Sequence, residues 1–188
     1  MSGQCHVGFM PRDVSEQDYP VSLFSYSVHV SVTEGAEATI NLDCRTDILA
    51  GSVDGTLRRF DVRTGHLITD LLHHPITSVG STKDFKCVLA CCTDSCIRVL
   101  SREGGNLLGT YRGHLHSYSR IEATFTPSDA HIVGCSEDGK IYYWDVLSSQ
   151  IETCFQAHDA EVTSLSIHPK GDFLLTSSTE GCIKLWKK

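Results

Sequence analysis

Hydrophobic residues in this sequence occur in short alternating runs that are separated by turn-forming residues. Four such runs lie at residues 48–51, 88–91, 131–135 and 173–177, and each is followed by an acidic turn and a second run. Alternation with a period of two, interrupted at short intervals by turns, is typical of β-strands. No segment has a sustained helical period. The pattern therefore predicts an all-β protein with almost no helix.

The runs belong to a repeat. Similar eight-residue segments begin at residues 54, 94, 138 and 180 and read DGTLRRFD, DSCIRVLS, DGKIYYWD and EGCIKLWK. They recur every 40 to 44 residues, and a period of about 40–45 residues is that of a four-stranded propeller blade. Each segment supplies one strand, with strands expected before it and a further outer strand after it. The expected outer strands are 67–71, 107–111 and 151–155.

This repeat divides the chain into an N-terminal segment, residues 1–35, and a propeller region, residues 36–188. The blades are expected at about residues 36–71, 72–112, 113–156 and 157–188. The N-terminal segment begins with polar residues and is expected to be partly disordered. Residues 21–32 (VSLFSYSVHVSV) are rich in strand-forming side chains and predict an extra strand.

The Gly-His and Trp-Asp dipeptides at the ends of the repeats resemble those of the WD-repeat family. The most specific match is Gly113-His114 followed by Trp144-Asp145. The resemblance covers about residues 36–188. It implies a β-propeller in which a His, a Ser or Thr, an Asp and a Trp form a hydrogen-bonded network inside each blade. The residues that match this network are His114, Asp138, Trp144, His158, Thr176, Glu180 and Trp186.

The match to this network is incomplete. Glu180 replaces the aspartate in the fourth blade, and Gly134 stands where the third blade should carry a hydroxyl group. The first two blades retain only Asp54 and Asp94. We therefore expect these two blades to be held by packing alone.

Within the family, residues 48–65, 107–114 and 131–145 resemble organizers of mitogen-activated protein kinase modules. That resemblance implies a seven-bladed ring, of which this chain carries what resemble the last four blades. We expect an open arc that pairs with another chain or aggregates, because its end blades expose apolar faces.

The same resemblance implies a non-enzymatic scaffold for components of the extracellular-signal-regulated kinase cascade. It further implies contact with a prolyl hydroxylase. A WD-repeat subunit of the spliceosome, acting in pre-mRNA splicing, remains open as the alternative. A propeller enzyme is less favoured, because the expected first strands are nearly all apolar or hydroxyl-bearing and offer no convergent titratable groups.

Charge and cysteine content limit the binding partners and the cellular compartments that are expected for this protein. The 188 residues include 23 acidic and 16 basic side chains, with a formal net charge of −7 and no Lys/Arg block, so direct nucleic-acid binding is not expected. The sequence contains no stretch of eighteen apolar residues, so a membrane span is not expected. The nine cysteines are odd in number and follow no secretory signal. They predict reduced thiols and a cytoplasmic location, with the nucleus as an additional compartment.

Two clusters of reactive residue types have a structural interpretation. Parts of a hydrolytic triad are resembled by two groups: His158 with Thr176 and Glu180, and His114 with Asp138. These residues recur at scaffold positions of the repeat, and no nucleophile elbow accompanies them. No catalytic residue is therefore assigned.

The cysteines at positions 91, 92 and 96, with His73 and His74 upstream, lack the paired spacing of a zinc site. Neighbouring cysteines in a strand also point to opposite faces. We expect free thiols there, and no metal or cofactor.

Strand order places the loops that enter each blade and the acidic turns on one rim of the propeller. Loops on a rigid scaffold commonly carry interaction residues. Tyr118 and His116 are the preferred anchors, because aromatic side chains are enriched at interaction hot spots. The candidate partner-binding residues are His73, His74, His116, Tyr118, Glu137, Asp159 and Glu161.

Overall fold

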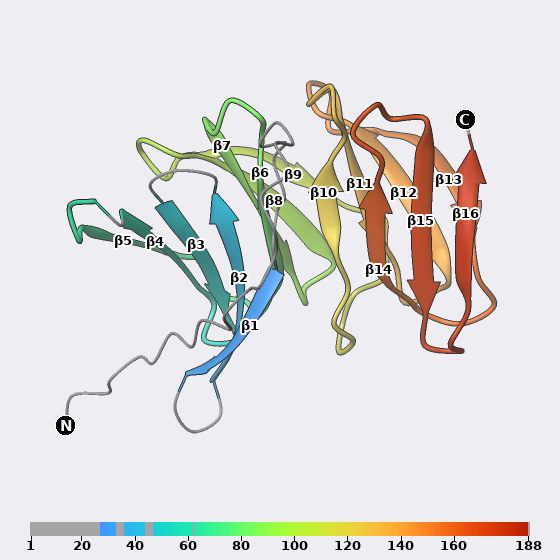
Figure 1. The fold of residues 1–188 in the computed structure, drawn as a ribbon, viewed down its shortest axis with the longest axis horizontal. Helices are drawn as coiled ribbons and strands as arrows, with labels where there is room; N and C mark the ends of the chain where they lie inside the picture. Colours follow the sequence, from blue (N-terminus) through green and yellow to red (C-terminus); the bar gives the residue numbers. More distant parts are fainter. Residues whose placement is uncertain (1–26, 33–35, 44–46, 62, 188) are drawn as a thin grey trace, which may run out of the picture.

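The computed structural model describes residues 27–32, 36–43, 47–61 and 63–187. These residues form antiparallel sheets and contain no helix, so the all-β prediction is confirmed. Figure 1 shows four sheets that follow one another in sequence order, with the first at the left and the fourth at the right. Consecutive sheets pack through their inner strands. The architecture is that of a partial propeller with four blades.

The strands of each sheet are consecutive in the chain. The first sheet contains β1 (Ser27–Val32), β2 (Ala36–Asp43), β3 (Asp47–Ser52), β4 (Thr56–Asp61) and β5 (Leu67–Leu71). The second contains β6 (Ile76–Ser81), β7 (Cys87–Cys92), β8 (Cys96–Ser101) and β9 (Leu107–Tyr111). The third contains β10 (Ala123–Phe125), β11 (His131–Cys135), β12 (Lys140–Asp145) and β13 (Ile151–Gln156). The fourth contains β14 (Val162–Ile167), β15 (Phe173–Ser178) and β16 (Ile183–Lys187).

The extra strand predicted over residues 21–32 corresponds to β1. It pairs antiparallel with β2, with Val28 opposite Ile40, and so extends the inner edge of the first sheet. It does not join the fourth blade as an outer strand. Residues 1–26, which include the predicted disordered start, lie outside the described residues.

The acidic turns form because one of their residues adopts a left-handed backbone. Gly55, Gly139 and Gly181 have φ values of 79°, 80° and 80°, and Ser95 has a φ of 57° at the equivalent place in the second blade. Glycine adopts this conformation without strain, since it lacks a Cβ atom. The Asp-Gly and Glu-Gly pairs therefore fix the point at which the chain reverses between the two middle strands of each blade.

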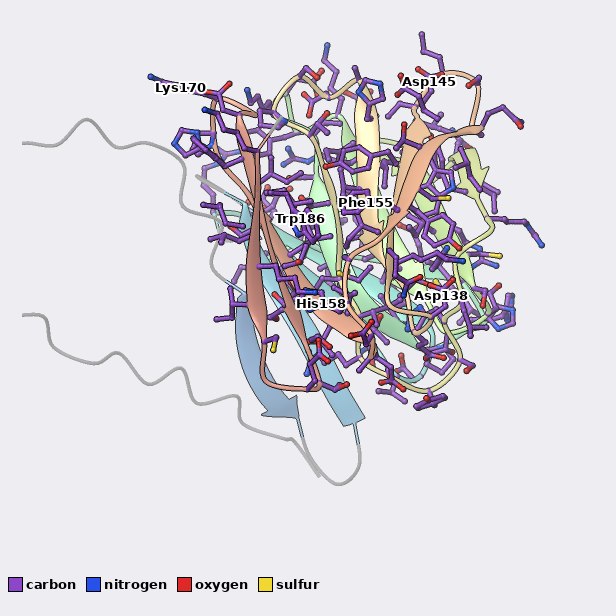
Figure 2. All side chains as sticks on the ribbon, turned by 90° about the vertical axis from the view of Figure 1, so that its right-hand side faces the viewer. Asp138, Asp145, Phe155, His158, Lys170 and Trp186 are labelled. Carbon is purple, nitrogen blue, oxygen red and sulfur yellow. The ribbon has the colours of Figure 1, made fainter. Side chains whose placement is uncertain are left out.

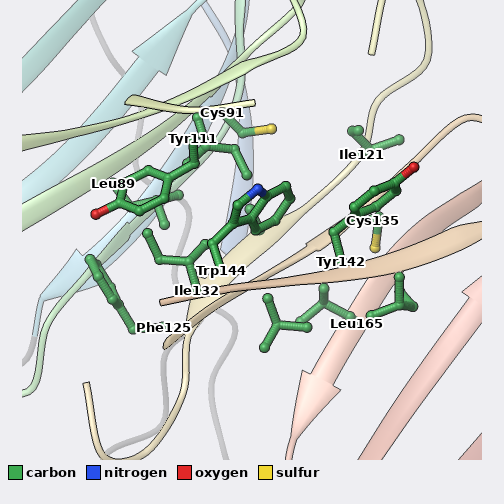
Figure 3. Close-up of a cluster of buried hydrophobic side chains, with 14 of the residues drawn as sticks. Leu89, Cys91, Tyr111, Ile121, Phe125, Ile132, Cys135, Tyr142, Trp144 and Leu165 are labelled. Atoms are coloured by element: carbon green, nitrogen blue, oxygen red, sulfur yellow. The ribbon is translucent and has the colours of Figure 1, made fainter. Parts of the chain in front are cut away.

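The larger of two buried clusters lies between the second, third and fourth sheets, around Trp144 (Figure 3). The Trp144 side chain is fully buried and stacks on Tyr142 at a ring-centroid distance of 5.6 Å. A Cβ atom at Gly134 would lie 2.9 Å from Trp144 Cζ3. The indole thus occupies the space that a hydroxyl-bearing side chain at position 134 would need.

The expectation that the first two blades are held by packing alone is wrong. In both, an arginine four residues after the acid forms an ion pair with it. Arg58 Nη2 lies 2.9 Å from Asp54 Oδ2, and Arg98 Nη1 lies 3.0 Å from Asp94 Oδ1. The second pair is largely buried and bidentate. Burial alone would raise the pKa of Asp94, but the bonds from Arg98 outweigh it and lower that pKa.

Candidate partner-binding rim

The entering loops and the acidic turns lie on one rim because backbone hydrogen bonds join them. Each of the four acidic turns makes at least one such bond. These bonds run from Leu72 N–H to Gly55 C=O (2.8 Å), Thr93 N–H to Pro75 C=O (3.0 Å), Glu137 N–H to Leu115 C=O (2.9 Å) and Thr179 N–H to Glu161 C=O (3.1 Å). In Figure 2, Asp138 lies at this rim and Lys170 at the opposite end of the sheets.

The longest loop of the rim joins β9 to β10, and its tip closes around a carboxylate. Glu137 accepts hydrogen bonds from the backbone N–H groups of Ser117, Tyr118 and Ser119 at 2.8, 2.9 and 2.8 Å, and from Ser117 Oγ at 2.8 Å. Burial alone would raise the pKa of Glu137, but these donors stabilise the carboxylate and lower its pKa to about 2. Glu137 therefore works as an internal brace that fixes the loop.

The braced loop presents two exposed apolar side chains. Tyr118 is 75% exposed and Leu115 is 51% exposed. The Tyr118 hydroxyl donates a hydrogen bond to Glu161 in the next blade, as does Ser119 Oγ. The bond to Glu161 raises the pKa of Tyr118. An aromatic ring is thus held outward from a loop tied to both the third and the fourth blade.

The other candidates on the rim divide into exposed and buried residues. His73, His74 and Asp159 are exposed, and Glu161 is half-buried. His74 Nε2 lies 3.5 Å from Asp94 Oδ2. These four residues and Tyr118 are therefore the predicted partner-binding residues whose side chains reach the rim surface.

The structure excludes His116 and Glu137 as direct partner contacts. His116 is completely buried and Glu137 is 8% exposed. The His116 ring turns inward, because its Nε2 lies 3.0 Å from the Ser119 carbonyl and its Nδ1 lies 3.5 Å from Cys91 Sγ. Adjacent loop positions point in opposite directions here, which the sequence pattern of a loop does not reveal.

The network of the fourth blade is complete. Trp186 Nε1–H donates to Thr176 Oγ1 at 2.9 Å, Thr176 Oγ1 lies 2.8 Å from His158 Nε2, and His158 Nδ1 lies 3.2 Å from Glu180 Oε1. Figure 2 labels His158 and Trp186 at the fourth sheet, which faces the viewer. A carboxylate only accepts hydrogen bonds, so the His158 Nδ1 proton points to Glu180. Thr176 is 1% exposed, and a buried hydroxyl in this network is unable to attack a substrate.

The network of the third blade is broken at Gly134. Without a hydroxyl there, Trp144 Nε1–H donates to the Arg112 carbonyl at 2.9 Å instead. Asp138 bonds to the Tyr142 hydroxyl at 3.1 Å. Both ring nitrogens of the buried His114 are left without a hydrogen-bond partner. Burial, and then the neighbouring His116, lower the pKa of His114 to about 4, so the ring is neutral at physiological pH.

Of the cysteines and histidines considered for a metal site in the sequence, Cys91 alone lies in such a cluster within the described ranges. His73 and His74 lie on the exposed rim. Within the described ranges, Cys91 instead lies together with His114 and His116, whose candidate ligand atoms are all within 4.8 Å of one another. The His-Leu-His spacing at residues 114–116 was the one signal in the sequence for this cluster, and its cysteine partner lies 23 residues upstream.

Comparison with known proteins supports the family assignment. The model of the family "WD domain, G-beta repeat" matches residues 105–145 and 149–187. Proteins named WD repeat domain-containing protein 83 are 37% identical over 142 residues in Rattus norvegicus and 42% identical over 141 residues in Xenopus tropicalis. These alignments cover 76% and 75% of this chain and 45% of each relative. The chain thus spans less than half the length of these relatives.

A crystal structure of the computationally designed Ika4 protein has the same fold, with a TM-score of 0.65 at 24% identity. The match covers 77% of this chain and 87% of the designed one. No helix able to cross a membrane occurs in the part of the chain that the structure describes. The matched repeats and the four antiparallel sheets together show that the chain contains WD repeats arranged as four blades of a partial β-propeller.

Proposed function

We propose that this chain is a non-enzymatic scaffold that binds protein partners through the rim around Tyr118. The observation that carries the proposal is the exposed Tyr118 ring on a loop that is fixed from inside by Glu137. A large aromatic side chain that is already held in place loses little conformational entropy on binding. Such a side chain is a suitable anchor for a protein partner.

The partners we propose are components of a mitogen-activated protein kinase module, in the extracellular-signal-regulated kinase cascade. Support comes from the resemblance of residues 48–65 and 131–145 to organizers of these modules. The rim also carries the acidic residues Asp159 and Glu161, and the Glu161 carboxylate accepts a hydrogen bond from Tyr118. A mixed apolar and acidic surface favours a partner that presents a basic segment next to an apolar one.

Affinity purification with mass spectrometry tests this proposal. The tagged chain should recover kinase-module components, and the double variant Leu115→Ser, Tyr118→Ala should lose them. Leu147→Ser is the matched control, because Leu147 is 95% exposed but follows β12 on the opposite rim. The control should recover the same partners as the unaltered chain.

Two results would contradict the proposal. Equal recovery by the double variant and the control would show that the rim around Tyr118 is not the contact surface. Recovery of spliceosomal proteins, without kinase-module components, would assign the chain to pre-mRNA splicing instead.

A further inference from the structure

Three buried side chains with metal-ligand chemistry meet beneath the partner-binding rim. Cys91 comes from β7 of the second blade, whereas His114 and His116 come from the loop that leads into the third blade. The Cys91 and His116 side chains are completely buried, and His114 is 3% exposed. Figure 3 shows Cys91 at the edge of the buried cluster around Trp144. A thiol and two imidazoles are a donor set that zinc(II) and copper(I) both accept.

The distances between the donor atoms approach those of a coordinated ion. Metal–sulfur and metal–nitrogen bonds of about 2.3 and 2.0 Å place tetrahedral sulfur and nitrogen ligands about 3.5 Å apart. Cys91 Sγ and His116 Nδ1 are already separated by 3.5 Å. All three donor atoms lie within 4.8 Å of one another. Closing the site therefore needs the remaining separations between donor atoms to shorten by no more than about 1.5 Å.

The surroundings of His116 orient it as a ligand. A carbonyl oxygen only accepts hydrogen bonds, so the Nε2 atom that lies 3.0 Å from the Ser119 carbonyl carries a proton. In the neutral ring, the lone pair is then on Nδ1, which faces Cys91. Metal-binding histidines commonly donate their second N–H group to a backbone carbonyl in this way.

His114 is the second, independent indication of a ligand. It is buried and neither ring nitrogen has a hydrogen-bond partner, although buried polar groups are nearly always paired. In the fourth blade the equivalent His158 is paired with Thr176 and Glu180. A metal ion bound with Cys91 and His116 would give His114 the partner that Gly134 fails to supply.

We propose that Cys91, His114 and His116 bind a thiophilic metal ion with a filled d shell, zinc(II) or copper(I). On binding, the Cys91 S–H bond loses its proton to solvent and a sulfur–metal bond forms, while both histidines coordinate as neutral imidazoles. Copper(I) gives an uncharged site. Zinc(II) leaves one positive charge, which is favoured by the electrostatic effect of the Asp94, Glu137 and Asp138 carboxylates on the His114 ring.

Titration of the reduced, chelator-treated full chain with zinc(II), in competition with a chromophoric chelator, is the first test. Titration with copper(I) under anaerobic conditions is the parallel arm, and the ion that binds more tightly than the competing chelator identifies the metal. Cys91→Ser should weaken binding by more than about 100-fold, because loss of a supporting partner alone costs about 10–100-fold. Cys92→Ser is the matched control. Cys92 is equally buried and adjacent but packs in the other cluster, and its variant should bind as the unaltered chain does.

A measurement on the unaltered chain keeps the test independent of how the variants fold. X-ray absorption at the metal edge should show one sulfur and at least two imidazole nitrogens as nearest neighbours. Cobalt(II) in place of zinc should show a thiolate charge-transfer band that Cys91→Ser removes and Cys92→Ser retains. Absence of tight binding of either ion, a first shell without sulfur, or equal binding by the two variants would overturn the proposal.

Discussion

His114 and His158 occupy equivalent places in consecutive blades, yet their surroundings differ. His158 is paired on both ring nitrogens, by Thr176 and Glu180. His114 is paired on neither, because Gly134 replaces the hydroxyl and Asp138 bonds to Tyr142 instead. The same repeat position thus supports the blade through hydrogen bonds in one case. In the other it leaves a buried donor set beside Cys91. A difference of one side chain between repeats is enough to free a residue from the scaffold.

The two tryptophans give the largest expected effect. Trp144 is fully buried in the larger cluster, whereas Trp186 is only half-buried. Trp144→Ala should lower the free energy of unfolding by about 3–5 kcal/mol, the range for a large buried aromatic, and Trp186→Ala should cost less. Urea denaturation of both variants checks the order. A greater loss of unfolding free energy for Trp186→Ala than for Trp144→Ala would place the more stabilising packing in the fourth blade and contradict this expected order.

Exchange of the hydroxyl position between the blades should give the next largest effect. Thr176→Val removes the hydroxyl with little change of shape and leaves Trp186 Nε1–H and His158 Nε2 unpaired, at a cost of about 1–3 kcal/mol. Gly134→Ser should also destabilise by about 1–3 kcal/mol. The reason is that its Cβ atom would lie 2.9 Å from Trp144 Cζ3 and 3.2 Å from Ile97 Cδ1. Measured unfolding curves that show Gly134→Ser to be stabilising would mean that the third-blade network is restorable.

The hydrogen bonds that Glu137 accepts under the rim should make the stability of the protein depend on pH. The folded pKa of Glu137 is about 2, below its ordinary value of 4.5. Its contribution is therefore fully present above pH 4.5 and is lost as the pH falls toward 2. Glu137→Gln should cost about 1–2 kcal/mol at neutral pH, and its stability should fall less steeply over that interval. A variant with the pH profile of the unaltered chain would show that Glu137 does not brace the loop.

The acid–arginine pairs of the first two blades should give the smallest effects. Asp94→Asn removes one charge from a largely buried, bidentate pair and should cost up to about 1 kcal/mol. Asp54→Asn is the comparison, because its pair with Arg58 is exposed and should contribute less. Thermal denaturation of the two variants measures the difference. Equal midpoints would indicate that burial does not distinguish the two blades.

The repeat period predicted the fold from the sequence, because alternating runs and acidic turns fix strands and reversals locally. The outer strands expected at residues 67–71 and 107–111 are β5 and β9. The side-chain directions in the loop from residue 113 to 122 were not predictable in this way. His116 turns inward because Ser119 and Cys91 are there to receive it, and both depend on how two blades pack. The Arg98 partner of Asp94 was missed because the family pattern directs attention to a histidine.

The most direct test of whether His114 and His158 have separate roles is nuclear magnetic resonance of the ring nitrogens in ¹⁵N-histidine-labelled protein. We expect that His158 carries its proton on Nδ1, facing Glu180, and that its signals do not respond to zinc(II) or copper(I). His114 and His116 should shift together when one equivalent of the bound ion is added, and should not shift in Cys91→Ser. Unchanged His114 and His116 signals, or a response of His158 equal to theirs, would contradict the account.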